Sequence, residues 1–367
     1  MRIAGVRAIP YAIPYRRPLH FASGSIDVAD NVLVEVTTDD GVVGVAEAPP
    51  RPYTYGETQA SIRTVIQRIF GPAIVGMPLL AREQVRQRLM RTVGNPAAKA
   101  ALDMAMWDAW GKTVGRPVHE LLGGFTDRLR VSHMLGFDDP AVVADQAVQI
   151  RDELGISTFK VKVGRRPPHL DIAVCRAVRE ALGDEAELYV DGNRGWSSTE
   201  AAAAVHELVE IGVVRVEELC PADDVMGRRW LVAQCRVPFL ADESVATPAE
   251  IVREVLAGAA TGISIKTART GFSDSLRVSH LAEGLGIDVV VGNQIDAQVG
   301  TACSLAFGAS QRSTSQNAAE LSNYLDMADD LLVVPLRIVD GEMHVRPGAG
   351  LGIEIDPAKL EHYRVER

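Results

Sequence analysis

The most restrictive feature of this sequence is an alternation of short β-rich runs with helical stretches, which begins near residue 130. Most of the runs recur about every 25 to 30 residues, the length of one strand followed by one helix. The eight candidate strands are residues 131–135, 158–163, 188–191, 213–217, 239–242, 262–266, 288–291 and a weaker run that ends near 320. Eight such units favour a closed barrel of the TIM type over an open sheet.

The segment before the barrel has a different pattern, typical of an α+β domain. Two β-rich runs around Asp39-Asp40-Gly41 indicate a hairpin, and the alanine-rich residues 97–110, which follow Asn95-Pro96, indicate a helix. From residue 331 the chain is β-rich again. We therefore predict an α/β protein with an α+β capping domain at 1–125, a modified TIM (β/α) barrel at 126–325 and a C-terminal segment at 326–367 that returns to the cap.

Charge and composition restrict the partners of the chain. It has 367 residues and a formal net charge of −10, with 47% hydrophobic and 23% charged residues. This acidic balance argues against binding to nucleic acid or to an anionic membrane surface. No run approaches the ~20 apolar residues of a membrane span, and the first residues lack the pattern of a secretion signal, so we expect a cytoplasmic protein. The cysteines form no Cys-x-x-Cys pair, so we expect reduced thiols at Cys175, Cys220, Cys235 and Cys303.

Charged residues stand at the ends of five successive candidate strands. In chain order they are Lys160 and Lys162, Asp191, Glu217, Asp242, and Lys266. All strand ends of a (β/α) barrel open toward one mouth, where active sites are found, so these side chains should converge there. Lys160 and Lys162 should point to the same side of their strand, because strand side chains alternate with a period of two.

This order of residues suits metal-assisted proton transfer. Neighbouring strands supply three carboxylates, which form the oxygen-rich cage that Mg²⁺ or Mn²⁺ prefers: Asp191, Glu217 and Asp242. Such a metal binds a substrate carboxylate and takes up charge as that carboxylate becomes an enolate. Lys162 and Lys266 flank the site, and either can move a proton at the neighbouring carbon. Lys160 either assists catalysis by lowering the pKa of Lys162 through like-charge repulsion, or only orients a carboxylate.

The site residues resemble those of the muconate lactonizing enzyme subgroup of the enolase superfamily, and the resemblance covers nearly the whole chain. It is carried by residues 101–108 (ALDMAMWD), 121–124 (LLGG), 159–164 (FKVKVG), 190–193 (VDGN), 216–218 (VEE), 241–244 (ADES) and 265–266 (IK). It implies an N-terminal capping domain and a modified barrel. It further implies a divalent metal on Asp191, Glu217 and Asp242, with Lys162 and Lys266 as the acid and base.

The sequence departs from the family pattern at two strand ends. The family usually has Glu-Gln-Pro or Glu-Glu-Pro at the fourth strand, whereas here Pro221 stands two places late, after Glu217-Glu218-Leu219-Cys220. The ligand is therefore Glu217 or Glu218, and Glu217 keeps one ligand at each strand end. The seventh strand end, 291–296 (VGNQID), has no histidine. The mandelate racemase subgroup needs one there, which argues against that subgroup.

The resemblance implies a partial reaction that several activities share. Members include muconate cycloisomerases, o-succinylbenzoate synthases, N-succinylamino acid racemases and dipeptide epimerases. Dipeptide epimerases typically carry Asp-x-Asp at the eighth strand, where this chain has 319–323 (AELSN). Glu320 and 293–296 (NQID) look like muconate lactonizing enzymes of actinobacterial type, which act on cis,cis-muconate in aromatic catabolism. The alternatives are racemisation or epimerisation of an N-acylated amino acid, dehydration of a hydroxy acid, and a non-catalytic barrel.

Loops of the cap should provide substrate specificity. His20 and Arg51 are candidate partners for a second substrate carboxylate, and Tyr53 lies in the same proline-rich loop as Arg51. At the barrel mouth we further expect substrate contacts from Asn193, Asn293 and Glu320, a cation at Arg269, and Glu243 as the partner of Lys266. The expected substrate is a small carboxylate. Members of the family are often octamers, so the resemblance also implies a homo-oligomer.

Overall fold

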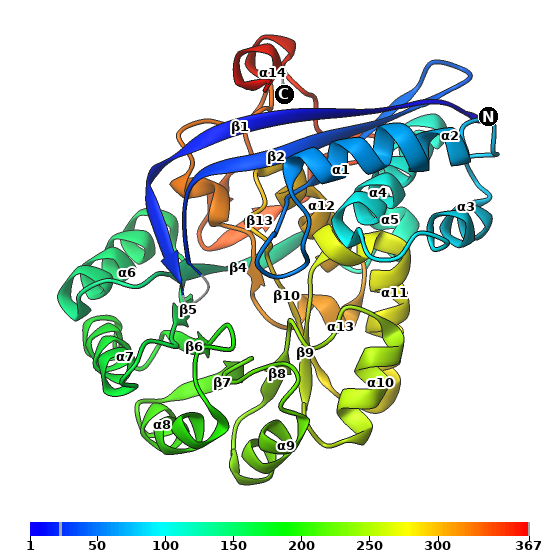
Figure 1. Cartoon of the computed structure of the whole chain (residues 1–367). Coiled ribbons are helices and arrows are strands. Elements are labelled where there is room, and N and C mark those ends of the chain that lie inside the picture. Colours follow the sequence, from blue (N-terminus) through cyan, green and yellow to red (C-terminus); the bar gives the residue numbers. More distant parts are fainter. Residues whose placement is uncertain (22–23, 366–367) are drawn as a thin grey trace.

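The computed structural model describes residues 1–21 and 24–365 and shows a parallel barrel beneath an antiparallel cap sheet (Figure 1). Seven parallel strands are each paired with their sequence neighbour: β4 (Arg128–Leu135), β5 (Thr158–Lys162), β6 (Glu187–Asp191), β7 (Val213–Glu217), β8 (Phe239–Ala241), β9 (Gly262–Ile265) and β10 (Asp288–Val291). An eighth strand, β11 (Ala319–Glu320), pairs in parallel with β4. The predicted barrel of eight strands is confirmed.

Side chains join β10 to β11 and so complete the ring. Asn317 Nδ2 donates a hydrogen bond of 2.8 Å to the carbonyl oxygen of Val289 in β10. Just beyond β10, the backbone N–H of Asn293 donates one of 3.1 Å to the carboxylate of Glu320. These bonds connect the seventh and eighth strands at both ends of the short β11.

Helices cover the outside of the barrel, as Figure 1 shows. They are α6 (Pro140–Leu154), α7 (His169–Leu182), α8 (Ser198–Glu210), α9 (Val225–Gln234), α10 (Pro248–Leu256), α11 (Thr267–Leu285), α12 (Gln298–Gly308) and the short α13 (Arg312–Ser315). Every residue of β5, β8 and β9 is buried. A strand with helices on one face and the barrel interior on the other has no solvent side, which explains the nearly continuous apolar runs.

The cap is built on one sheet of three antiparallel strands. They are β1 (Ile3–Phe21), β2 (Gly24–Thr38) and β3 (Val43–Ala48), and the predicted turn at Asp39-Asp40-Gly41 joins the last two. The cap helices are α1 (Gln59–Val65), η1 (Ile66–Phe70), α2 (Gly71–Ile74), α3 (Arg82–Leu89), α4 (Pro96–Val114) and α5 (Val118–Leu122). Helix α4 lies against β3 so closely that a Cβ at Gly44 would stand 2.0 Å from the carbonyl oxygen of Ala105. Only glycine fits there.

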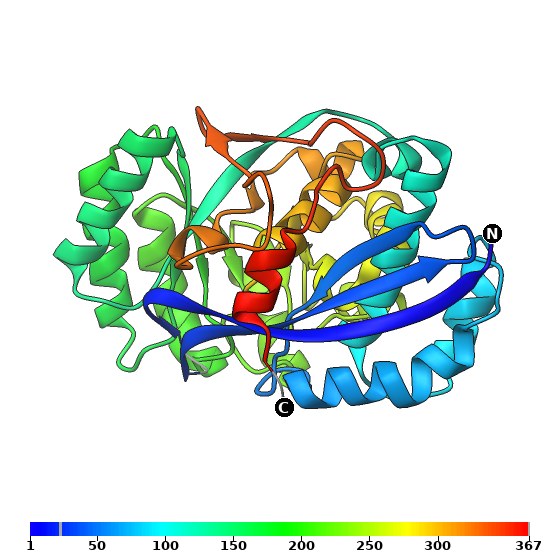
Figure 2. The same ribbon diagram turned by 90° about the horizontal axis from the view of Figure 1, so that it is seen from above.

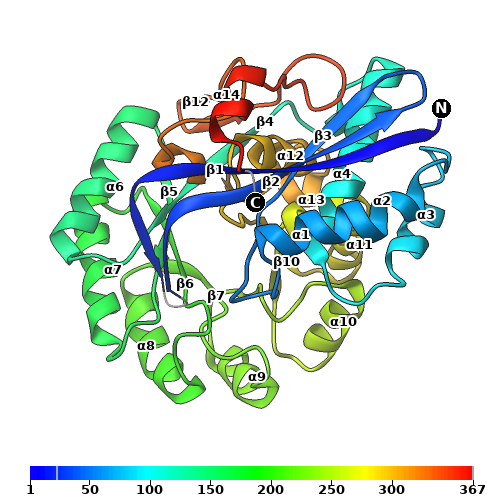
Figure 3. The ribbon, with the colours of Figure 1, turned by 45° about the horizontal axis from the view of Figure 1, so that its top comes forward.

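The C-terminal segment contains η2 (Asn323–Asp326), β12 (Ile338–Val339), β13 (Glu342–His344) and α14 (Pro357–Tyr363). Strand β13 pairs antiparallel with β4, and the N–H of Val365 donates to the carbonyl oxygen of Pro10 in β1 at 3.0 Å. Figure 2 shows α14 beside β1, and Figure 3 shows the β1–β2 hairpin bending down toward β5 and β6. Of the described helices, none is long and apolar enough to cross a membrane. The four cysteines are free thiols, as predicted.

Candidate active site

The predicted charged residues meet at the carboxyl ends of the barrel strands. Strand register places Lys162 of β5 opposite Asp191 of β6, and Asp191 opposite Glu217 of β7. Asp242 directly follows β8, and Lys266 directly follows β9 and is the N-cap residue just before α11. The three carboxylates are 0% exposed, and the two lysines are 8% exposed, so a cluster of charges lies almost out of contact with water.

Lys160 lies at the centre of this cluster and is only 1% exposed. Its ammonium nitrogen is 3.1 Å from Asp191 Oδ2, 2.9 Å from Glu217 Oε2 and 2.7 Å from Glu320 Oε1. Burial disfavours the charge on Lys160, but these three carboxylates outweigh burial and hold its pKa well above the usual value. Lys160 is therefore an ammonium ion that holds carboxylates together.

The other two lysines each bind one of the outer carboxylates. Lys162 Nζ donates to Asp191 Oδ2 and to Asn193 Oδ1, at 2.6 Å in both cases. Lys266 Nζ donates to Asp242 Oδ2 at 2.5 Å. Arg269, the additional cation expected from the sequence, donates to the other oxygen of Asp242 at 2.7 Å.

These cations set the protonation of the three carboxylates. Burial alone would raise the pKa of Asp191, but Lys160 and Lys162 lower it below its usual range. In the same way, Lys266 and Arg269 overcome burial and lower the pKa of Asp242. Glu217 behaves differently, because burial and its acidic neighbours raise its pKa well above the usual value although Lys160 lies close by. Asp191 and Asp242 are therefore firmly ionised, whereas Glu217 between them has too little positive charge nearby to offset its burial.

The geometry favours Glu217 over Glu218 as a metal ligand. Both oxygens of Glu217 are buried, and neither accepts a hydrogen bond from the described residues. Glu218 is fully occupied: its oxygens accept from Arg228 Nη1, from the N–H groups of Asp242 and Ser244, and from Ser244 Oγ. The only cation near Glu217 among the described residues is Lys160, which it shares with two other carboxylates, and a hard divalent metal suits an oxygen donor set of this kind.

The three carboxylates nevertheless have ammonium partners in this structure. Within residues 1–21 and 24–365, no three acidic, imidazole or thiol side chains are already gathered as a metal site. Asp191 and Asp242 each turn one oxygen toward a lysine at 2.5–2.6 Å. The donor set fits Mg²⁺ or Mn²⁺ in its chemistry, and holding either ion would require these carboxylates to loosen their lysine contacts.

One prediction needs correction, namely the pairing of Glu243 with Lys266. Lys266 forms its ion pair with Asp242, whereas Glu243 Oε1 accepts a hydrogen bond of 2.9 Å from Asn193 Nδ2. Asp242 immediately follows its strand, so its carboxylate reaches Lys266 first. Burial and the neighbouring carboxylates raise the pKa of Glu243 to about 7. Glu243 therefore holds Asn193, which in turn holds Lys162.

A glycine leaves room for Lys266 at the end of β10. A Cβ at Gly292 would stand 2.3 Å from Ser264 Oγ and 3.0 Å from Lys266 Cε. Any other residue would clash with Ser264 and press on the side chain of Lys266. The position of this ammonium group therefore depends on Gly292 as well as on its charged partner.

A small cavity opens onto the lysines and includes most of the predicted substrate contacts. Its lining contains Arg51, Lys160, Lys162, Asn193, Lys266, Asn293 and Glu320, together with Ser132, Met134, Ile295, Ser322 and Asn323. Its volume is about 40 Å³, which holds little more than a water molecule. A larger outer cavity of about 570 Å³ shares Arg51 and Ile295 with it. These two side chains form the partition between an outer vestibule and the charged site.

Ile295 has an unusual backbone at this partition. Its φ is +60°, a conformation that is strained for a β-branched residue. The other two predicted cap contacts lie farther out. Tyr53 lines only the outer cavity and is 73% exposed, and His20 has an exposed side chain that lines neither cavity.

Sequence reasoning missed Tyr189, and it included Tyr55 only as part of the candidate cap loop at residues 50–55. Tyr189 donates a hydrogen bond of 3.1 Å to Glu320 Oε1, and it lies two residues before Asp191 on the same face of β6. The strand period of two would have found it. Tyr55 comes from the cap and accepts a hydrogen bond of 2.7 Å from Arg269, which also binds Asp242. No local pattern connects Tyr55 with a residue more than two hundred positions away.

Comparison with known proteins identifies the class of this site. Residues 3–123 match the family described as mandelate racemase / muconate lactonizing enzyme, N-terminal domain, and residues 142–359 match the family described as enolase C-terminal domain-like. The chain belongs to the enolase superfamily and is an isomerase of that superfamily.

Particular relatives lie within one subgroup of activities. A muconate lactonizing enzyme from Mycobacterium smegmatis, solved with muconolactone, is 62% identical over the full length of both chains, with a TM-score of 0.98. Muconate cycloisomerase 1 from Rhodococcus opacus is 31% identical and covers 97% of this chain and 96% of its own. The L-Ala-D/L-Glu epimerase of Bacillus subtilis is 30% identical, with coverage of 86% and 87%.

Proposed function

We propose that this enzyme is a muconate cycloisomerase, which converts cis,cis-muconate reversibly to muconolactone. The observation that carries the proposal is the placement of Lys162 and Lys266 on opposite sides of the three buried carboxylates. The high similarity to a structure that holds muconolactone supports the choice of substrate. The substrate is a dianion, and the site offers several lysines within a chain that is acidic overall.

Asp191, Glu217 and Asp242 are the residues that would hold a divalent metal, Mn²⁺ or Mg²⁺. A metal in this place supplies an electrophile that binds one substrate carboxylate and stabilises negative charge developing beside it. Lys160 does not leave the cluster in this scheme, because Glu320 and Glu217 hold its ammonium group from two sides. It keeps the ligands aligned and offsets their mutual repulsion.

The lysines then control the proton. An oxygen of the distal carboxylate forms a bond to the fourth carbon of the substrate, counted from that carboxylate. The double bond between the fourth and fifth carbons opens, and its electron pair moves to the fifth carbon, which is next to the other carboxylate. Lys162 donates a proton to this carbon, so no atom is lost and the product is an isomer. Asn193 gives the ammonium group of Lys162 a second acceptor, which keeps it in place when Asp191 turns away. Lys266 holds the negative charge on the opposite side.

The cap admits and orients the distal carboxylate. Arg51 lines both the outer cavity and the charged site, so its guanidinium is placed to meet an anion that passes between them. The inner cavity is too small for a six-carbon diacid in this structure, so Arg51 or its loop must move to admit the substrate.

A second candidate is racemisation or epimerisation of an N-acylated amino acid. It is favoured by the similar surroundings of Lys162 and Lys266, each bound to one carboxylate, since racemisation needs an acid and a base on opposite faces. The epimerase among the relatives supports the same possibility. Lactonisation needs only one of the two lysines as the acid.

A spectroscopic assay tests the proposal. We expect purified protein with Mn²⁺ to remove the ultraviolet absorbance of cis,cis-muconate rapidly, and chelation of the metal to stop the reaction. N-succinyl amino acids and dipeptides incubated in D₂O serve as the comparison. Fast exchange of their α-proton with no loss of the muconate signal would replace the cycloisomerase by a racemase or epimerase.

A further inference from the structure

The cap loop of residues 50–56 contacts the barrel at the edge of the charged site. The hydroxyl of Tyr55 accepts a hydrogen bond of 2.7 Å from Arg269 Nη1, and the same nitrogen donates to Asp242 Oδ1 at 2.7 Å. One cation thus joins a side chain of the cap to a proposed metal ligand of the barrel.

Arg269 has few other contacts that hold its guanidinium. Its Nη2 atom donates to the carbonyl oxygen of Ser264 at 2.7 Å, and its Nε atom is buried without a hydrogen-bond partner among the described residues. Within that part of the chain, Asp242 is the only carboxylate in an ion pair with Arg269. The hydroxyl of Tyr55 is therefore one of three acceptors that orient this cation.

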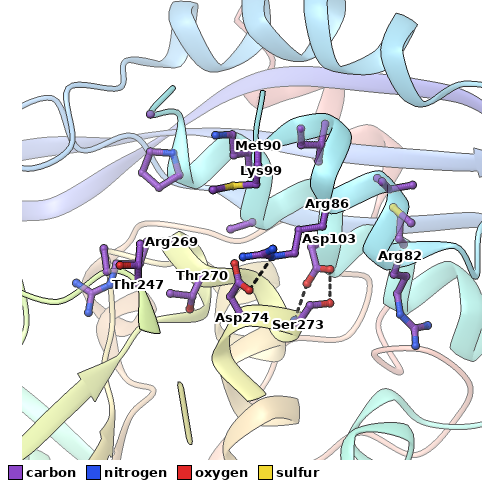
Figure 4. A pocket seen from close by; sticks show the side chains of 17 residues that line it. Arg82, Arg86, Met90, Lys99, Asp103, Thr247, Arg269, Thr270, Ser273 and Asp274 are labelled. Carbon is purple, nitrogen blue, oxygen red and sulfur yellow. Dashed lines mark hydrogen bonds and ion pairs between the residues drawn. The ribbon is translucent and has the colours of Figure 1, made fainter. Parts of the chain in front are cut away.

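The acidic residues of a neighbouring cavity do not compete for Arg269. Arg269 also lines a cavity of about 250 Å³ between α3, α4 and α11, and Figure 4 shows its guanidinium pointing away from Asp103 and Asp274. Those two carboxylates accept hydrogen bonds from Ser273 and from Arg86, respectively. The cavity leaves space beside Arg269, so the guanidinium can change its orientation when one of its partners is removed.

The loop itself is a compact turn that joins Tyr55 to Arg51. The carbonyl oxygen of Arg51 accepts hydrogen bonds from three successive N–H groups, those of residues 54, 55 and 56, at 3.1, 2.8 and 3.2 Å. Because these bonds hold the two ends of the turn together, a displacement of Tyr55 also displaces the backbone of Arg51. The side chain of Arg51 lines the inner cavity, so the turn connects a residue at the entrance of the site with Asp242.

Both ends of the loop are fixed to other elements. Before the loop, the carbonyl oxygen of Pro49 accepts a hydrogen bond of 3.2 Å from Gln294, which lies beyond β10. After the loop, Glu57 accepts from the N–H groups of residues 97 and 98 at the start of α4, at 2.8 and 3.1 Å. The turn between these anchors can move as one unit, and the hydroxyl of Tyr55 connects this unit to the barrel.

We propose that Tyr55 is a positioning residue that couples the cap loop to the metal ligand Asp242 through Arg269. Lys266 binds one oxygen of Asp242 and Arg269 binds the other, so an ion that displaces the lysine leaves the arginine contact in place. Order imposed on Asp242 by the metal is then passed to Tyr55 and its turn, and the reverse also holds because coupling between two sites is reciprocal. The inference rests on the metal site of the proposed function and is independent of the substrate.

Calorimetric titration of the full chain with Mn²⁺ tests the coupling. We expect Tyr55→Phe to weaken Mn²⁺ binding at least about threefold, because it removes one hydrogen bond from the group that orients a ligand. Tyr53→Phe is the matched control, since Tyr53 lies in the same loop but is 73% exposed, and it should bind Mn²⁺ as the unmodified protein does. In an Arg269→Met background, Tyr55→Phe should have no further effect on Mn²⁺ affinity.

Hydrogen exchange followed by mass spectrometry reports on the loop itself. In the unmodified protein and in Tyr53→Phe, Mn²⁺ should slow amide exchange in residues 54–56, whereas in Tyr55→Phe it should not. Failure of Mn²⁺ to slow this exchange, an equal slowing in Tyr55→Phe, or equal Mn²⁺ affinities of Tyr55→Phe and the control would each overturn the proposal and leave the metal site intact. No binding of Mn²⁺ by the unmodified protein would instead refute the metal site of the proposed function, and the coupling with it.

Discussion

The ammonium group of Lys160 on β5 lies 2.7 Å from the carboxylate of Glu320 on β11, deep in the barrel. The same nitrogen contacts Asp191 and Glu217, so one cation holds three carboxylates from three different strands. The sequence left open whether Lys160 tunes Lys162 by like-charge repulsion or orients carboxylates. Its burial and its three acidic partners favour the orienting role.

Removal of Lys160 should therefore destabilise the barrel. Lys160→Met leaves three buried carboxylates without their shared cation, and breaking a buried ion pair from one side costs about 3–5 kcal/mol. We expect a loss of that size in the free energy of unfolding, measured by urea denaturation without metal. Added Mn²⁺ should restore part of it. Unchanged stability would show that Lys160 does not hold the cluster together.

Glu218 should control metal affinity although it is not a proposed ligand. It fixes the backbone of Asp242 and Ser244 and is itself held by Arg228. Loss of a residue that orients a ligand typically weakens metal binding by about 10–100-fold. We expect a decrease of that size for Mn²⁺ in Glu218→Gln, measured by calorimetry, and none in the exposed Glu210→Gln. Equal affinity in both variants would limit Glu218 to a role in folding.

Arg51 should distinguish dicarboxylates from monocarboxylates. In Arg51→Ala we expect at least about a tenfold rise in KM for muconate, because a charge-assisted hydrogen bond to the distal carboxylate is lost. Arg51→Lys should recover part of the loss. Competition assays with saturated mono- and dicarboxylates provide the check, and an unchanged preference for dicarboxylates would remove Arg51 from substrate recognition.

The contact between cap and barrel should weaken as pH rises. Burial and Asp296 raise the pKa of Glu47 in β3 to about 8, and burial raises the pKa of Asp296 beyond β10 to about 7. Glu47 accepts hydrogen bonds from Tyr11 and from the N–H of Ala297, so it links the two domains. Both carboxyls keep their protons in the folded protein at pH values where the unfolded chain has lost them.

The stabilising contribution of these protons is complete below pH ~4 and is lost as pH rises toward 8. For each proton that the folded protein binds in excess of the unfolded chain, the free energy of unfolding falls by about 1.4 kcal/mol per unit rise in pH within that window. We expect Glu47→Gln to flatten the fall in melting temperature between pH 5 and 8. A melting curve series on the metal-free protein provides the measurement. Identical slopes for the variant and the unmodified protein would refute the linkage.

The sequence predicted the barrel and its charged mouth because both depend on local, periodic patterns. Lys162, Asp191 and Glu217 stand at consecutive strand ends, and parallel pairing of neighbouring strands brings such ends together. The partner of Lys266 was predicted incorrectly, because two adjacent acidic residues, Asp242 and Glu243, offer the same charge. Their different directions become evident only when the loop after β8 is folded.

Contacts between the cap and the barrel could not be predicted in this way. Tyr55 reaches Arg269, and Glu47 meets the N–H of Ala297, across sequence separations of more than two hundred residues. His20 was proposed as a substrate contact because of its loop composition, yet its exposed side chain does not line the site cavities. The path of the β1–β2 hairpin decides which cap residues face the barrel, and that path depends on packing of the whole domain.

The most direct test of the central claim is proton exchange at the carbon that Lys162 is proposed to protonate. Muconolactone incubated with the Mn²⁺-loaded enzyme in D₂O should exchange the proton next to its free carboxylate, as followed by ¹H NMR. We predict that Lys162→Ala abolishes this exchange and that Lys266→Ala retains a measurable rate. Exchange that persists without Lys162 and disappears without Lys266 would contradict the assignment, and no exchange by the unmodified enzyme would contradict the proposed reaction.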